Sequence, residues 1–149
     1  ANKNFTQARG GYRLSTLLLL LLCYSNVSQS QSSSFDDTTL SGAVDEWLSD
    51  ATTAEAKYGH ISTWDTSSVT SFEELFCASS YYCGSTAASS FNGDVSQWDT
   101  SSVTDMRYTL SGATSFNRQL GGAWSGSTAV GRTDRGGTDM FHGSGGSIV

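Results

Sequence analysis

The heptapeptide Trp-Asp-Thr-Ser-Ser-Val-Thr occurs twice in this chain, at residues 64–70 and again at residues 98–104. Seven identical residues do not recur by chance within 149 positions, so the fold must place both copies in equivalent environments. Repeating units that cannot bury a core alone stack on their neighbours, and such arrays usually serve as binding surfaces. The repeat therefore favours a stacked array over a fold built around a catalytic pocket.

The similarity between the two copies extends beyond the heptapeptide. An apolar residue stands three positions before each tryptophan, and a Ser-Phe-Asn sequence ends at Asn92 and at Asn117. The tryptophans are 34 residues apart and the Phe-Asn pairs are 25 apart, so the first unit carries a nine-residue insertion. Trp124 and residues 139–141 mark a weaker third unit. A period of about 25 residues lies in the range of leucine-rich-repeat-like solenoids.

We therefore expect an α/β fold, a short leucine-rich-repeat-like solenoid of about three coils with small parallel strands and an N-terminal capping helix. Each coil would contain an extended piece, a sharp turn and a short strand leading into a helical turn. Large aromatic side chains buried in such a stack contribute about 2–3 kcal/mol each. The recurring structural residues are Trp64, Asp65, Val69, Phe91, Asn92, Trp98, Asp99, Val103, Met106, Phe116, Asn117 and Trp124.

Two segments are expected to precede the repeats. Residues 1–25 have the basic, apolar and small-polar order of a signal peptide, and the apolar run of about ten residues is too short to span a membrane. Cleavage is expected near Ser25 or Ser28, with an uncleaved anchor or a lipoprotein acylated at Cys23 as alternatives. Residues 26–39 are Ser-rich and lack periodicity, which is typical of a flexible linker.

The repeat domain is expected to occupy residues 40–149. Apolar residues at helical spacing predict a capping helix over 41–57, with Ser41 as its N-cap. The coils would then follow in three ranges, at about residues 58–92, 93–117 and, in degenerate form, 118–149.

The charge of the chain limits its partners. The formal net charge is −6, and three of the eight basic residues lie in the first thirteen positions. The rest of the chain has five basic residues against fourteen acidic ones, and such a surface repels nucleic acid and anionic membranes. The expected partner is an extracellular protein or glycan, with membrane contact only through an uncleaved signal or missing segments. No cofactor is expected.

The inserted stretch of the first unit contains the best candidate binding residues. Cys77 and Cys83 have five residues between them, and in an oxidising compartment they are expected to form a disulfide. An incomplete zinc site and free thiols are the alternatives. Tyr81 and Tyr82 lie inside this loop and could stack on a sugar ring or a partner surface. The alternative is that one tyrosine folds back onto the solenoid.

The aspartates of the repeat allow two interpretations. Asp65 and Asp99 could contribute, with Asp94 and Asp105, to a calcium site made of hard oxygen ligands. The preferred interpretation is that each aspartate caps its own turn by accepting backbone N–H bonds, as Asp-Thr-Ser sequences commonly do. We therefore expect no metal site.

Asparagine and histidine residues are interpreted mainly as structural. Asn92 and Asn117 recur at the coil period and are expected to form a stacked ladder that satisfies buried backbone groups, with ligand binding as the minor alternative. His60 and His142 raise the possibility of a hydrolase. The chain has neither a G-x-S-x-G elbow nor an H-E-x-x-H sequence, so no catalytic residues are expected.

Residues 91–106 read Phe-Asn-Gly-Asp-Val-Ser-Gln-Trp-Asp-Thr-Ser-Ser-Val-Thr-Asp-Met. This sequence resembles the BspA-like surface repeat, which is abundant in mycoplasma surface lipoproteins as a domain of unknown function. Residues 56–61 and 120–125 are similar to versions found in diatoms and other marine algae. The resemblance covers about residues 40–149. It implies a leucine-rich-repeat-like solenoid on a secreted or surface-attached protein, with no catalytic residues.

Two departures from the resembled pattern carry expectations of their own. The nine-residue insertion is atypical, and Thr109-Leu110 stands where the repeat usually has Met-Phe, so this coil is expected to pack less well. We expect a secreted, non-enzymatic module that mediates protein or glycan interaction. A passive wall or matrix component is the alternative, and a hydrolase is a remote one.

Overall fold

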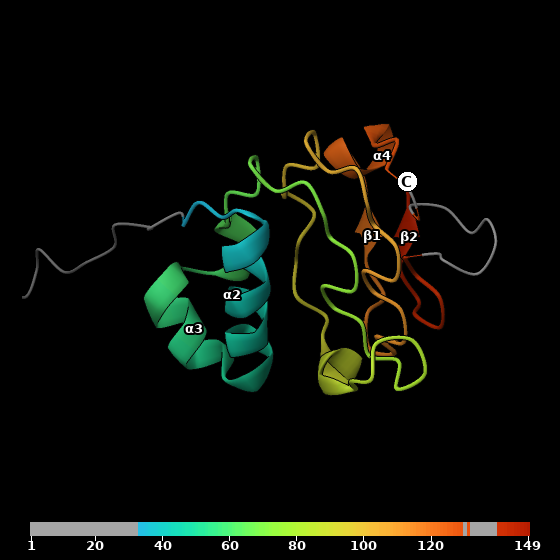
Figure 1. Cartoon of the computed structure of the whole chain (residues 1–149), viewed down its shortest axis with the longest axis horizontal. Helices are drawn as coiled ribbons and strands as arrows, with labels where there is room; N and C mark the ends of the chain where they lie inside the picture. Colours follow the sequence, from blue (N-terminus) through green and yellow to red (C-terminus); the bar gives the residue numbers. More distant parts are fainter. Residues whose placement is uncertain (1–32, 130, 132–139) are drawn as a thin grey trace, which may run out of the picture. The chain divides into compact units, whose positions relative to one another are not determined.

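The computed structural model describes residues 33–129, 131 and 140–149 of the chain (Figure 1). The expected signal peptide and residues 26–32 of the expected linker lie outside the described residues. In chain order the elements are α2 (Asp37–Ser49), α3 (Ala51–Tyr58), the 3₁₀ helices η1 (Ile61–Thr63) and η2 (Ala87–Ser90), β1 (Gln119–Leu120), α4 (Ala123–Gly126) and β2 (Ser147–Ile148).

The capping helix differs from its prediction. It begins at Asp37 rather than after Ser41, because the Asp36 carboxylate accepts the backbone N–H groups of Thr38 and Thr39 at 3.1 and 2.8 Å. It also ends early, because Asp50 closes α2 and serves as the N-cap of a second helix, α3. The expected single helix over 41–57 is therefore wrong. Two helices lie side by side at this end of the described domain (Figure 1).

The expectation of a flexible linker is wrong for residues 33–39. Phe35 is buried, and its ring contacts those of Tyr58 and Trp64 at centroid distances of 5.7 and 4.8 Å. Its backbone N–H donates to the Asp65 carbonyl at 2.9 Å, and Asp65 N–H donates to Ser33 at 2.9 Å. A buried aromatic ring and a parallel bridge fix this segment against the first repeat.

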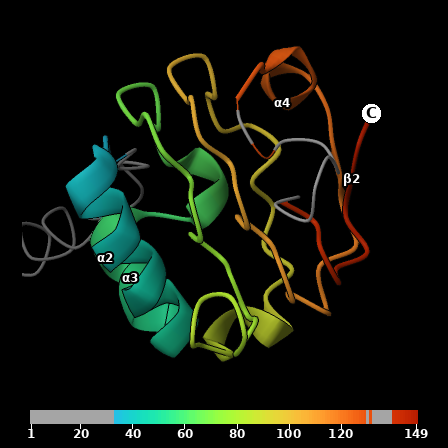
Figure 2. The same ribbon diagram turned by 45° about the vertical axis from the view of Figure 1, so that its right-hand side comes forward.

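The repeat units lie next to one another and run in the same direction. Phe72, Phe76 and Ala78 of the first unit donate backbone N–H bonds of 2.7–2.8 Å to residues 33 positions later in the second unit. Further along the chain, β1 pairs with β2 in parallel, with Leu120 opposite Ile148. Figure 2 shows these extended segments side by side, between α2 and β2.

Aromatic side chains stack in rows that follow the units. The Trp64 and Trp98 rings lie 6.1 Å apart and 13° from parallel. Phe116 lies between Phe91 and Phe141, at centroid distances of 6.0 and 6.4 Å. The eight apolar residues that the repeat predicts as structural are all buried, namely Trp64, Val69, Phe91, Trp98, Val103, Met106, Phe116 and Trp124.

The indole N–H groups repeat the same bond from unit to unit. Trp98 donates to the Ile61 carbonyl at 2.8 Å, and Trp124 donates to the Val95 carbonyl at 3.0 Å. Ile61 and Val95 are the equivalent residues three positions before Trp64 and Trp98. Each of these bonds satisfies a buried indole with a carbonyl of the preceding unit.

The expectation that Thr109-Leu110 packs less well is wrong. Both residues are fully buried. The Thr109 hydroxyl lies 2.9 Å from the Phe72 carbonyl and 2.8 Å from the Met106 carbonyl and donates to them. A threonine can replace a large apolar residue here because its hydroxyl has partners within the core.

A left-handed backbone residue also recurs in register. Glu74 and Tyr108 have φ angles of 59° and 56°, and they are 34 residues apart, as the two heptapeptides are. Neither is glycine, so each carries a conformational cost that its unit must offset. The turn at Tyr108 places its ring against that of Tyr82 in the inserted loop.

Candidate aromatic binding surface

The inserted loop is closed by a disulfide. Cys77 and Cys83 are bonded, with Cα atoms 6.2 Å apart, which confirms the predicted pairing. Within the loop, the Cys83 N–H donates to the Ser79 carbonyl at 3.0 Å and the Tyr82 N–H donates to the Ser79 hydroxyl at 3.2 Å. At its base, the Ala78 N–H donates to Ser111 of the second unit at 2.7 Å. The loop is thus fixed both to itself and to the neighbouring unit.

The two loop tyrosines behave differently. Tyr82 is 37% exposed and stacks on Tyr108 with a centroid distance of 4.8 Å and an interplanar angle of 20°. Its edge contact with His142 has a centroid distance of 5.6 Å. Tyr81 stands perpendicular to Tyr82 at 4.9 Å and is 85% exposed. We call Tyr81, Tyr82, Tyr108 and His142 the aromatic surface.

The alternative that one tyrosine folds back is confirmed for Tyr82, and the stacking of Tyr81 on a partner stays a prediction. Tyr82 folds back onto the repeats, and Tyr81 projects into solvent. Tyr108 is not among the predicted binding residues, since nothing in the sequence pattern indicates that residue 108 meets a residue of the insertion. His142 is considered from the sequence only as a histidine that raises the possibility of a hydrolase, and not as part of a binding surface. The repeat register could have placed Tyr108 at a turn, because it aligns with Glu74 of the first unit.

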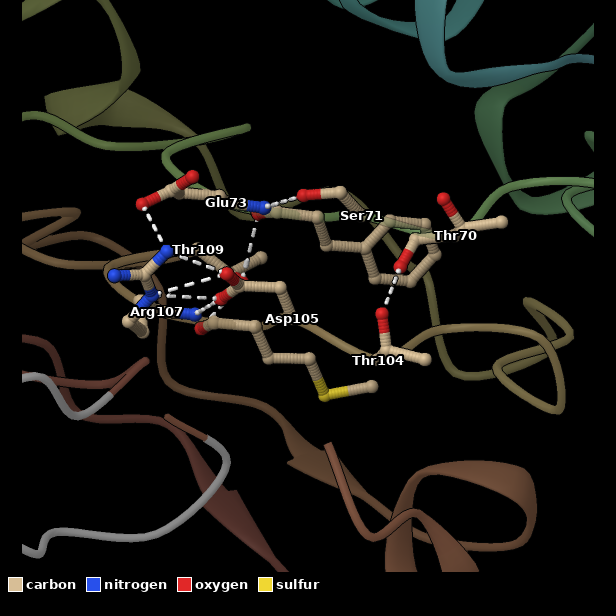
Figure 3. A network of polar contacts seen from close by, with 9 residues as sticks. Thr70, Ser71, Glu73, Thr104, Asp105, Arg107 and Thr109 are labelled. Atoms are coloured by element: carbon tan, nitrogen blue, oxygen red, sulfur yellow. Dashed lines mark hydrogen bonds and ion pairs between the residues drawn. The ribbon is translucent and has the colours of Figure 1, made fainter. Parts of the chain in front are cut away.

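An ion-pair network lies beside Tyr108 in sequence (Figure 3). Arg107 Nη2 lies 2.8 Å from Glu73 Oε1 and 2.6 Å from Asp105 Oδ2. The hydrogen bond from Arg107 lowers the pKa of Asp105, and the same bond raises the pKa of Arg107. The charge of this arginine is therefore already neutralised by two carboxylates.

The other described basic residues are also engaged. Lys57 Nζ lies 2.8 Å from Glu46 Oε1. Arg118 Nε donates to the Asn92 carbonyl at 2.7 Å, and its guanidinium lies 3.9 Å from Asp94. With Arg107, these complete the basic residues in the part of the chain that the structure describes.

The heptapeptide aspartates cap their turns. Asp65 Oδ1 accepts the Ser67 N–H at 3.1 Å and the Ser67 hydroxyl at 2.7 Å, and Asp99 Oδ1 accepts the Ser101 N–H at 2.8 Å. These bonds, with the serine hydroxyl as the first cause, lower the pKa of both carboxyls. The turn-capping interpretation is confirmed. Within residues 33–129, 131 and 140–149, no three acidic, histidine or cysteine side chains gather to hold a metal ion.

The asparagine pair is partly as predicted. Asn92 Nδ2 donates to Asn117 Oδ1 at 3.2 Å, and the Asn117 N–H donates back to Asn92 Oδ1 at 3.4 Å. The two side chains form one rung between adjacent units. Both residues are exposed, however, so the expectation that they satisfy buried backbone groups is wrong.

The two histidines lie in unrelated settings. His60 Nδ1 lies 2.7 Å from the Ser62 hydroxyl and accepts the Ser62 N–H at 3.3 Å, so the ring caps η1. His142 belongs to the aromatic surface, and its carbonyl accepts the Gly112 N–H at 2.7 Å. Each ring thus has a local structural role.

A shallow depression also lies between the second and third units. It has a volume of about 580 Å³ and is lined by Ser96, Gln97, Trp98, Asp99, Gly121, Gly122 and Ala123. The Trp98 ring beneath it is almost fully buried, and the Asp99 carboxylate is used by its own turn. The aromatic surface is therefore the stronger candidate site.

Comparison with known proteins gives one match. The family described as "Mycoplasma protein of unknown function, DUF285" matches residues 29–143, which is more than half of the chain. No curated protein and no solved structure gives a significant match. Among the described residues, no helix has the length and apolar character needed to cross a membrane.

Proposed function

The chain belongs to the DUF285 family, a surface-associated repeat family of unknown function, and we propose that it is an exported, non-enzymatic interaction module. It would bind an extracellular protein or glycan through the aromatic surface. The repeats would form a leucine-rich-repeat-like solenoid of about three coils that holds this surface in place. The observation that carries the proposal is the 85% exposure of Tyr81 on a disulfide-closed loop.

Large aromatic rings are mostly buried in the described part of this chain, so the exposed pair in the inserted loop needs an explanation. Among the described residues, the large apolar side chains left exposed are Tyr81, Tyr82 and Val149. Two of the three are adjacent and lie in the one inserted loop. A buried tyrosine ring removes about 150–250 Å² from water, so a partner that covers Tyr81 gains affinity from it.

The loop is also prepared for binding. The Cys77–Cys83 disulfide limits the conformations of the chain between them, and the Tyr82–Tyr108 stack fixes the residue next to Tyr81. A partner therefore has less conformational entropy to remove when it binds than it would on an open loop. This pre-organisation supports a binding role for the insertion.

A non-enzymatic role agrees with the use of the polar side chains. Asp65, Asp99 and Asp105 are engaged in turns and ion pairs, and His60 caps a 3₁₀ helix. Catalysis needs a general base held near a nucleophile and a place for the reacting atoms. These groups serve the backbone around them instead.

The test is binding of the exported chain to an extracellular matrix preparation from its own source, measured by surface plasmon resonance. Tyr81→Ala should weaken binding about tenfold or more, since a central aromatic contact is worth at least about 1.4 kcal/mol. Ser80→Ala, in the same loop, is the matched control and should bind as the parent chain does. Equal binding by the parent and Tyr81→Ala would refute the proposal. Concentration-dependent self-assembly in its place, seen by light scattering, would favour a passive matrix component.

A further inference from the structure

We infer that the ligand of the aromatic surface is an uncharged polysaccharide, with a sugar ring stacked on Tyr81. This inference rests on the proposed function and specifies its partner class. It is carried by three observations on the described residues: the geometry of the rings, the state of their hydroxyl groups, and the charges around them.

The ring geometry suits a ligand with flat C–H faces. Tyr81 is 85% exposed, so a face of its ring is open to a stacked sugar. Tyr82 and Tyr108 are nearly parallel, and Tyr81 is at 90° to Tyr82. The surface therefore offers rings in two perpendicular orientations, one for the face of a sugar unit and one for the edge of its neighbour in the polymer.

The phenolic hydroxyls supply the polar part of the recognition. No hydroxyl of Tyr81, Tyr82 or Tyr108 bonds to another described residue, whereas the Tyr58 hydroxyl donates to Glu46 at 3.1 Å. Each free phenol can donate one hydrogen bond and accept others. A sugar presents hydroxyl groups around an apolar ring face, which is the complement of an exposed phenol.

The charges of the described residues disfavour anionic glycans. Arg107 follows Asp105 and precedes Tyr108, and it is paired with Glu73 and Asp105 at 2.8 and 2.6 Å. Lys57 and Arg118, the other described basic residues, are engaged by Glu46 and by the Asn92 carbonyl. Among the described residues, a sulfate or uronate group would find no unpaired basic side chain, and the net charge of −6 would repel it.

The surroundings of Tyr81 favour a glycan over a protein hot spot. A protein hot spot is a desolvated aromatic anchor seated in a packed pocket with apolar neighbours. Tyr81 is 85% exposed and so is not seated in such a pocket; its ring contacts Tyr82 at 4.9 Å, and the small polar residues Ser79 and Ser80 precede it in the loop. An exposed ring supported by a second aromatic ring, without a desolvated pocket around it, suits a stacking contact with a hydrated polymer.

The experiment uses the disulfide-bonded chain in affinity electrophoresis through gels that contain one polysaccharide each. The neutral probes are a soluble β-1,3-glucan, hydroxyethyl cellulose and a mannan, and the anionic probes are heparin and alginate. At least one neutral probe should retard the parent chain, and the anionic probes should not. Tyr81→Ala should weaken the retardation about tenfold. Tyr81→Phe should retain most of it, and Ser80→Ala should retain it fully.

The outcomes separate this inference from the proposed function. Preferred binding to heparin or alginate, or neutral binding that survives Tyr81→Ala, overturns the inference. Tyr81-dependent binding to the matrix preparation without binding to any neutral polysaccharide overturns it and leaves the proposed function standing. Loss of Tyr81 dependence in both assays removes both. Because Tyr81 is exposed, its variants should fold, and an unchanged near-ultraviolet circular dichroism signal from the buried tryptophans verifies this.

Discussion

Buried threonine and tryptophan side chains in this protein bond to backbone carbonyls of neighbouring units. The Thr66 hydroxyl donates to the Asp99 carbonyl at 2.9 Å, and Thr100, its equivalent, donates to the Ala123 carbonyl at 2.8 Å. The indole bonds follow the same rule. One described residue breaks it: the Ser111 hydroxyl is fully buried and has no hydrogen-bond partner. A buried hydroxyl without a partner carries an uncompensated desolvation cost.

Replacing Ser111 by alanine should stabilise the protein by about 1 kcal/mol, because the variant removes that cost and little volume. The melting temperature should rise by a few degrees in calorimetry. Thr109→Val is the matched control, since Thr109 is equally buried but its hydroxyl is bonded. That variant should lose about 1 kcal/mol. A loss of stability in Ser111→Ala would contradict the assignment of an unsatisfied hydroxyl.

At the scale of single residues, the sequence predicts which apolar side chains are buried, but it predicts only some of the contacts between polar or exposed side chains. Identical residues at a fixed period identify Trp64 and Trp98 as buried partners without any structure. They do not indicate that Tyr82 would stack on Tyr108, because one of these residues belongs to an insertion outside the period. Contacts between a repeat and an insertion depend on the conformation of the loop, which no periodicity encodes.

The N-terminal helix α2 acts as a substitute for a preceding unit. Between units, the Thr104 N–H donates to the Thr70 carbonyl at 2.8 Å. The equivalent N–H of Thr70 has no earlier unit to bond, and it donates to Asp37 Oδ1 at 2.6 Å instead. The Thr70 hydroxyl donates to Asp37 Oδ2, also at 2.6 Å. A carboxylate at the start of a helix thus replaces a backbone carbonyl of the array.

Asp37→Ala should therefore destabilise the protein by about 1–2 kcal/mol. This is the value of a hydrogen bond to a charged group, reduced because Asp37 is exposed. Urea unfolding followed by tryptophan fluorescence measures the change. Asp45→Ala, on the same helix, is the control and should be neutral or slightly stabilising because alanine favours helix. Equal effects of the two substitutions would mean that α2 contributes by its apolar face alone.

The boundaries of these helices show why the cap was predicted only in part. The apolar spacing correctly indicates a helix near residues 41–57, since Leu40, Ala43 and Val44 form its buried face. The start was missed because Asp36 and Thr39 form a capping box without the glutamate that usually marks one. The break at Asp50 was missed because its apolar neighbours continue the helical pattern.

At the scale of the whole molecule, aspartate side chains stabilise the turns and the N-terminal cap by accepting hydrogen bonds. Six of the described aspartates have a pKa below the usual value with a hydrogen bond from another side chain as the first cause: Asp36 from Thr39, Asp37 from Thr70, Asp50 from Thr53, Asp65 from Ser67, Asp99 from Ser101 and Asp105 from Arg107. The folded state therefore binds protons less readily than the unfolded chain. Its stability must rise with pH wherever the unfolded aspartates are still protonated.

We expect the melting temperature to be nearly constant above about pH 5 and to fall as the pH decreases below about 4, the usual pKa of an unfolded aspartate. The loss continues as the pH passes through the lowered pKa values of the folded state. Thermal unfolding followed by circular dichroism between about pH 2 and pH 7 measures this. Asp37→Asn should show a shallower decline than the parent chain, because one titrating group has been removed from the linkage. A parallel decline in both proteins would exclude Asp37 as a contributor.

The position of the disulfide-closed loop determines which residues of this protein tolerate substitution. The insertion lies between Phe76 and Phe91 in the sequence. The rings of these two residues nevertheless stack with centroids 4.1 Å apart, and the aromatic row continues from Phe91 to Phe116. The exposed loop residues Ser80 and Tyr81 can thus be exchanged while the surrounding frame keeps its packing. The arrangement separates an exposed loop tip from the packed rows that support it. Foreign residues grafted in place of Ser80 and Tyr81 would be displayed on a scaffold whose core does not contain them.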